Sequence, residues 1–99
     1  MKSLNKILKG EWKFDGDKAT LTKPNGKIRL HFSSGKVFMV ADSASPVTLK
    51  ITVDGKAQAD VLVNKSQLYP LFDSEDYKEH TIDIEIPDAG FEAFTFTFG

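Results

Sequence analysis

The sequence predicts an all-β domain, a mostly antiparallel two-sheet sandwich with jelly-roll, galactose-binding-like character. Short segments that alternate polar and apolar residues recur about every ten residues, and turn signals separate nearly all of them. After Gly10, no segment is helical and long enough to cross over between parallel strands. Together these two observations indicate antiparallel sheets that pack face to face.

The strands are expected over residues 11–14, 18–22, 27–32, 36–41, 47–53, 58–63, 67–72, 80–86 and 91–98. The segment 36–41 is apolar almost throughout, so its strand should be central and covered on both faces. Pro70 cannot donate to a ladder, which places the strand at 67–72 on an edge or at a bulge. Asn25-Gly26 and Asp54-Gly55 have the composition of hairpin turns.

The C-terminal third supplies much of the expected core. Residues 80–86 and 91–98 alternate, and the second segment places three phenylalanines on one strand face. We therefore expect a single core that contains Ile28, Leu30, Leu49, Ile51, Ile82, Ile84, Phe94, Phe96 and Phe98.

The N-terminal ten residues are interpreted separately from a single β-sandwich domain at 11–99. Leu4, Ile7 and Leu8 lie at i, i+3 and i+4, as in one or two helical turns, and Gly10 ends the pattern. Residues 1–10 are thus expected to form a linker or a short helix. They lack the long apolar region of a signal peptide, and no apolar segment of the chain reaches the ~20 residues that span a bilayer.

Charge and cysteine content exclude several classes of function. The net charge is −1, so no global field favours nucleic acid or an anionic membrane surface. The basic residues concentrate in the first half and the acidic residues in the second, a division that antiparallel pairing would mix in space. With no cysteine, the chain has no disulfide, no thiolate nucleophile and no cysteine-based zinc site.

Candidate catalytic and metal-binding groups are few. His31 and His80 are not in a metal-ligand spacing, and no GxSxG elbow is present. The acidic loops at 15–17 and 73–76 could bind calcium through their carboxylates or could be ordinary turns. Neither has the spacing of a known calcium loop. We expect no enzyme activity, no cofactor and no metal.

Candidate ligand contacts come from the aromatic residues and from one polar strand face. Alternation leaves Arg29, His31, Lys50 and Thr52 on an outer face, where Arg29 offers a planar donor fork. Trp12 or Tyr77 would supply a stacking platform for a sugar or an extended peptide. The same sequence pattern is also expected if the aromatic residues only pack in the fold and the polar strand face is only solvated.

Four segments carry a resemblance to a known family: Gly10-Glu11-Trp12, Val53-Asp54-Gly55-Lys56, Leu68-Tyr69-Pro70-Leu71, and the ending Ala93-Phe94-Thr95-Phe96-Thr97-Phe98-Gly99. On these segments the chain resembles the C-terminal domain of DipZ-type thioredoxin-like proteins of bacteria, a β-sandwich similar to carbohydrate-binding modules. The resemblance extends from about residue 8 to residue 99, and the Phe-Thr-Phe-Gly ending is its most specific part.

The resemblance implies an accessory role beside a thioredoxin-like domain, in a periplasmic or other extracytoplasmic compartment. The redox CxxC motif of such proteins has no counterpart here, and no ligand-contact residue carries over. Two functions stay open: a non-catalytic module that binds carbohydrate or extended peptide, and a structural domain that docks to its neighbour or dimerises. Neither involves nucleic acid or direct insertion into a membrane.

Overall fold

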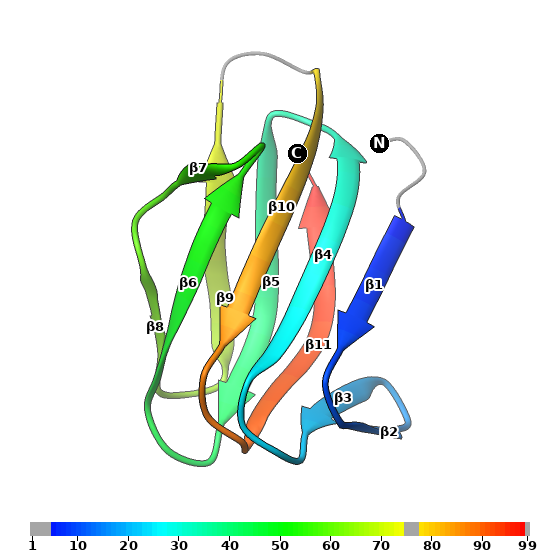
Figure 1. Cartoon of the computed structure of the whole chain (residues 1–99), viewed down its shortest axis with the longest axis vertical. Helices are drawn as coiled ribbons and strands as arrows, with labels where there is room; N and C mark the ends of the chain where they lie inside the picture. The colour runs from blue at the N-terminus through cyan, green and yellow to red at the C-terminus, as the bar shows by residue number, and fades with distance from the viewer. Residues whose placement is uncertain (1–4, 75–77, 99) are drawn as a thin grey trace.

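A computed structural model describes residues 5–74 and 78–98, and these residues form two antiparallel sheets packed face to face (Figure 1). The front sheet contains, in order, β1 (Asn5–Lys9), β4 (Gly26–Ser33), β10 (Glu79–Ile86), β6 (Val47–Val53) and β7 (Lys56–Ala57), and β8 (Val61–Val63) also pairs with β6. The back sheet contains, in order, β2 (Trp12–Asp15), β3 (Lys18–Leu21), β11 (Phe91–Phe98), β5 (Lys36–Ser43) and β9 (Gln67–Asp73). The predicted all-β sandwich is confirmed.

Most consecutive strands lie in different sheets, as in a jelly roll. The chain passes from front to back after β1, β4, β8 and β10, and it returns to the front after β3, β5 and β9. The first crossing occurs at Gly10, whose φ of 105° suits glycine. Within the described residues, no helix has the length and apolarity that a membrane crossing requires.

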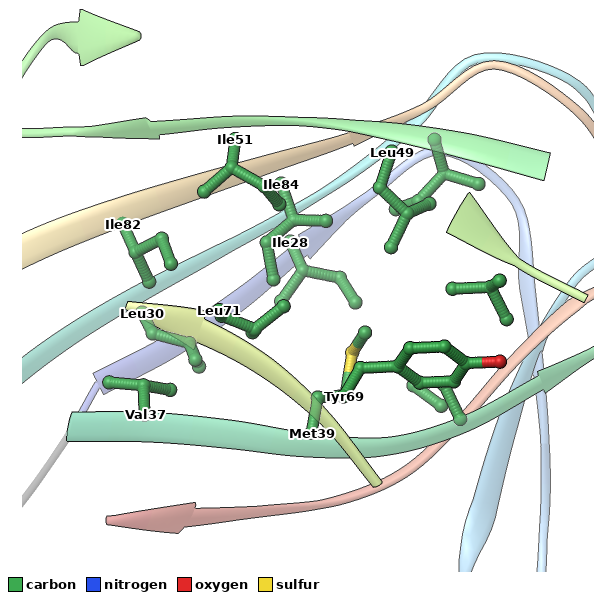
Figure 2. Close-up of a cluster of buried hydrophobic side chains, with 14 of the residues drawn as sticks. Ile28, Leu30, Val37, Met39, Leu49, Ile51, Tyr69, Leu71, Ile82 and Ile84 are labelled. Atoms are coloured by element: carbon green, nitrogen blue, oxygen red, sulfur yellow. The ribbon is translucent and has the colours of Figure 1, made fainter. Parts of the chain in front are cut away.

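The core lies between the sheets and is built from inward-pointing aliphatic side chains (Figure 2). All six aliphatic residues expected there are at most 1% exposed: Ile28, Leu30, Leu49, Ile51, Ile82 and Ile84. The aromatic part of the core differs from the prediction, because the fully buried phenylalanines are Phe32 and Phe91. Phe96 and Phe98 are half-buried and pack against the core from its margin.

A β-bulge explains why the C-terminal phenylalanines are not the centre of the core. The register between β11 and β5 shifts between Ala93 and Thr95, so Phe94 is the extra residue. Before the bulge Phe91 and Ala93 are buried, and after it the inward positions change parity to Phe96 and Phe98. A strict alternation read from the chain end therefore misses Phe91 and places Phe94 wrongly.

The helical turn expected at the N-terminus is also wrong for the residues that the structure describes. Asn5–Lys9 is strand β1, which pairs along its whole length with β4, and Leu8 packs against the core. A helix of this length is marginal in water without a partner. Pairing with β4 satisfies the same backbone groups and partly buries Leu8.

Two of the turn and edge predictions are confirmed and one is corrected. Asp54-Gly55 closes the β6–β7 hairpin with both residues at positive φ, as a type I′ turn requires. Pro70 lies on an edge strand next to a register shift. Asn25-Gly26 does not close a hairpin, because it joins β3 of the back sheet to β4 of the front sheet. Asn25 N–H instead donates to the Pro87 carbonyl.

Strand β5 is central, as expected, but only one of its faces is covered. Val37, Met39 and Ala41 are fully buried toward the front sheet. Phe38 and Val40 point the other way and are half-buried, and they are not among the residues packed against the core. No second layer of described residues covers this outer face.

Candidate binding surfaces

The front sheet brings the predicted polar residues onto one outer face. Arg29 and His31 alternate on β4, while Lys50 and Thr52 alternate on β6, with β10 between the two strands. In register, Asp83 of β10 lies between Arg29 and Thr52. The face therefore carries rows of side chains that can pair across strands.

Arg29 is held by the acidic residue beside it. Its Nε donates to Asp83 Oδ1 at 2.7 Å, and its Nη2 donates to Asp83 Oδ2 at 3.3 Å. This hydrogen bonding and the carboxylate charge raise the pKa of Arg29 above its ordinary range. The donor fork that the sequence offered to a ligand is thus occupied within the sheet.

His31 has partners on the same neighbouring strand. Its Nε2 lies 3.2 Å from Glu79 Oε1, and its Nδ1 lies 3.1 Å from Thr81 Oγ1. Because a carboxylate only accepts, Nε2–H donates to Glu79, and a neutral ring then accepts from the Thr81 hydroxyl. A ligand at this position would have to replace both contacts.

Lys50 lies at the other end of the face, on a shallow depression of about 400 Å³. Glu85 of β10 stands in register between Lys50 and Lys27, and all three residues line the depression. Neither lysine forms an ion pair with any described residue. Among the residues that the structure describes, no phenylalanine, tyrosine or tryptophan lines this depression.

The predicted aromatic platforms do not join this face among the residues that can be placed. Trp12 is on the back sheet, where its Nε1–H donates to the Lys9 carbonyl at 2.9 Å and its ring meets Phe91 edge-on. Tyr77 lies outside the described residues. Tyr69 is buried, and its hydroxyl donates to the Lys65 carbonyl at 2.6 Å. The indole and the described tyrosine therefore have packing roles.

An aromatic cleft that the sequence did not indicate opens at one side of the sandwich, between β1 of the front sheet and β2, β3 and β11 of the back sheet. We call it the side cleft. Its volume is about 240 Å³, and it is lined by Lys6, Leu8, Phe14, Gly16, Asp17, Lys18, Ala19, Ile28, Ala93, Phe94 and Phe96.

Two local features produce the side cleft. The β2–β3 hairpin presents Phe14, which is 70% exposed, and the bulge in β11 lets Phe94 line the same space. Charged groups surround the rings: Lys18 Nζ lies 3.1 Å from Glu92 Oε2, while Asp17 and Lys6 form no ion pair with a described residue. Phe14 has the same parity on β2 as Trp12, but it is exposed whereas Trp12 packs against the core.

The second histidine serves the fold rather than a site on the surface. His80 is 9% exposed, and its ring lies near the rings of Phe32 and Phe72. Its Nδ1 lies 2.6 Å from Asp54 Oδ2, and Asp54 Oδ1 also accepts from Thr81 N–H. The described residues contain no group of three or more potential metal ligands.

The fold is shared with solved structures of carbohydrate esterases. The chain matches a family two carbohydrate esterase from Clostridium thermocellum, in complex with cellohexaose, with TM-score 0.87 and 19% identity over 96% of the chain. It also matches the family two esterase of Cellvibrio japonicus (TM-score 0.73, 14% identity, 97% of the chain). A third match is an acetyl xylan esterase from Butyrivibrio proteoclasticus (TM-score 0.67, 10% identity, 100% of the chain).

The chain spans only about a third of each esterase, namely 31%, 33% and 32% of their lengths. At this identity the matches show a common fold and nothing about activity. No curated protein sequence gives a significant match. A family model does match, over residues 2–99, and the chain belongs to that family, the thioredoxin-like C-terminal domain.

Proposed function

We propose that this chain is a non-catalytic binding domain that accompanies a thioredoxin-like domain and recognises a neutral oligosaccharide in the side cleft. The observation that carries the proposal is the exposed Phe14 ring, which lines one cleft together with Phe94. Phe14 is 70% exposed beside the second ring. A ligand that covered Phe14 would remove this apolar surface from water, which favours binding.

The chemistry of the side cleft suits a sugar. The apolar face of a pyranose ring can lie on the Phe14 or Phe94 ring, and its hydroxyls need both donors and acceptors at the margin. Asp17 provides acceptor oxygens and Lys6 provides ammonium donors. The cleft is open to solvent, so we expect weak binding, with Kd in the ~0.1–1 mM range, or about 4–5.5 kcal/mol.

The likeness to the esterases guides the choice of probe. The Clostridium thermocellum enzyme was solved in complex with cellohexaose, and the matched part is about a third of that protein. Cellohexaose and a xylo-oligosaccharide are therefore reasonable first ligands. An extended peptide is the alternative ligand class, because edge strand β1 borders the cleft and could pair with an added strand.

A second candidate site is the outer face of the front sheet. The depression beside Lys50 favours it, since its volume exceeds that of the side cleft. The contacts of Arg29 and His31 with β10 argue against it, because a ligand must first replace them. The lack of a described aromatic platform in the depression also lowers its expected affinity for sugars.

The non-catalytic part of the proposal rests on the sequence. With no cysteine, the chain cannot perform thiol–disulfide exchange with its own side chains. We extend the proposal to hydrolysis, since no nucleophile signature is present in the sequence. An NMR titration that observes the sugar as well as the protein would reveal hydrolysis.

An NMR titration with cellohexaose and a xylo-oligosaccharide tests the site. We expect shifts in the backbone amides of residues 14–19 and 91–96, and constant shifts at 29–32 and 48–52. Phe14→Ala should weaken binding roughly threefold to tenfold, the loss of one aromatic contact. Leu62→Ala is the matched control, because Leu62 is an exposed apolar residue of the front sheet, remote in sequence and register from the cleft.

Each other outcome contradicts a stated part of the proposal. Shifts confined to residues 29–32 and 48–52 would move the site to the front face. Unchanged spectra at saturating sugar would exclude oligosaccharides as the ligand. New sugar resonances that grow with time and with protein concentration would show catalysis.

A further inference from the structure

The outer face of the back sheet carries an apolar patch that the chain does not cover. Phe38 and Val40 of β5 lie in register with Pro70 and Leu68 of β9, so the four side chains are neighbours across two strands. Leu68 is 51% exposed, and Pro70 is exposed. We call these four residues the back patch.

Threonines border the back patch on one side, and charged residues border it at the two ends of β5. On the threonine side, Thr97 of β11 lies in register with Phe38, and Thr95 lies in register with Val40. The charged outward positions of β5 are at its two ends, at Lys36 and Asp42. Single exposed apolar residues are ordinary, but four that meet across adjacent strands form a continuous surface.

The sequence of β5 is that of a strand covered on both sides. Val37, Met39 and Ala41 fill the core, and the intervening positions Phe38 and Val40 are also apolar. Strands that face solvent on one side normally alternate with polar residues, as β4 and β10 do here. The composition of β5 therefore indicates that another layer of protein covers the outer face of the back sheet.

We infer that the back patch packs against the thioredoxin-like domain with which this family of domains is associated. The size of the patch selects this occupant over a second copy. A stable interface between free proteins involves ~20–30 residues and about 800 Å² on each side. The back patch offers four apolar side chains and two threonines, too few for a lasting dimer of independent chains.

A covalently linked neighbour needs less contact area. A short linker holds it at an effective concentration in the millimolar range, so a small surface can keep two domains in register. Interfaces between domains of one chain are also more polar than obligate ones, which fits the threonine margin. This inference does not depend on the oligosaccharide proposal, because the side cleft opens between the sheets and the back patch lies on an outer face.

The test uses a two-domain protein in which a thioredoxin-like domain, taken from a protein that carries this type of C-terminal domain, precedes the chain. NMR relaxation then measures the tumbling of each domain. We expect the two domains to share one rotational correlation time. Leu68→Lys should release them, so that this domain approaches the correlation time of a free 11.0-kDa protein. Leu62→Lys is the matched control, since Leu62 is 52% exposed but faces outward from the front sheet, and it should leave the domains coupled.

Three results would overturn the inference. The unmodified domains could tumble independently, or Leu62→Lys could release them as fully as Leu68→Lys. The isolated chain could instead form a concentration-dependent dimer that Leu68→Lys abolishes, which would make a second copy the occupant. Cellohexaose binding measured in the Leu68→Lys variant keeps the two proposals apart, because it should be unchanged whichever result is found here.

Discussion

The two outer faces of this sandwich differ in how their side chains find partners. On the front face, Arg29 pairs with Asp83 and His31 pairs with Glu79, both across to β10. On the back face, the cross-strand partners of Phe38 and Val40 are apolar residues and threonines. Arg29 and His31 thus have their partners within the chain, whereas no described residues cover the apolar patch of the back face.

The difference shows that polarity alone is a poor guide to a binding surface. The front face has the charged and planar groups that commonly mark a ligand site, but its cross-strand pairs link the basic first half of the chain to the acidic second half. Those groups stabilise the pairing of β4 with β10. The back face also carries charged residues, but its uncovered apolar patch is the stronger sign of a partner.

The largest effect that tests this comparison concerns the two sides of β5. Met39→Ala should lower the free energy of unfolding by about 2–5 kcal/mol, because it leaves a cavity between the sheets. Phe38→Ala, one residue away, should cost less than about 1 kcal/mol in the isolated chain, since Phe38 lies outside the core. Urea denaturation of both variants measures the two values.

A similar cost for the two substitutions would break the comparison. It would mean that Phe38 is covered by the chain itself, and the back patch would lose its status as an open surface. Val37→Ala provides a check on the method, because Val37 is fully buried on the same strand and should behave like Met39.

The fold was predictable because alternation and turn composition agree over most of the chain. β4, β6 and β10 bury every second residue, as their sequences indicate. The prediction failed where a tertiary partner overrides a local pattern. Asn5–Lys9 has helical spacing but pairs with β4, and a bulge at Phe94 changes the parity of β11.

The candidate sites were less predictable, because they depend on where one sheet stops covering the other. Phe14 and Trp12 have the same parity on β2, yet Trp12 packs on the core and Phe14 is exposed. No property of the sequence tells these two positions apart. The outer location of Phe38 and Val40 follows from parity, but their lack of a covering layer appears only in three dimensions.

An intermediate effect on the free energy of unfolding is expected for the partly buried pair of His80 and Asp54. Asp54→Asn should cost about 1–2 kcal/mol, because the charged acceptor of the buried His80 is lost while Thr81 N–H keeps an oxygen partner. Asparagine also tolerates the positive φ of 52° at this position. Urea denaturation should place this variant between Met39→Ala and Phe38→Ala, and a change below about 0.5 kcal/mol would show that the pair contributes little.

The smallest effect is expected for the Arg29–Asp83 pair on the open front face. A double-mutant cycle with Arg29→Ala and Asp83→Ala should give a coupling energy that is small at low salt and smaller still at 1 M salt, because solvent and ions screen exposed charges. The raised pKa of Arg29 keeps it charged across the accessible pH range, so deprotonation of Arg29 cannot remove the pair. If the coupling were large and independent of salt, the front face would be held much more rigidly than its exposure suggests. An oligosaccharide could then bind Arg29 only at a high energetic cost, which would strengthen the case for the side cleft.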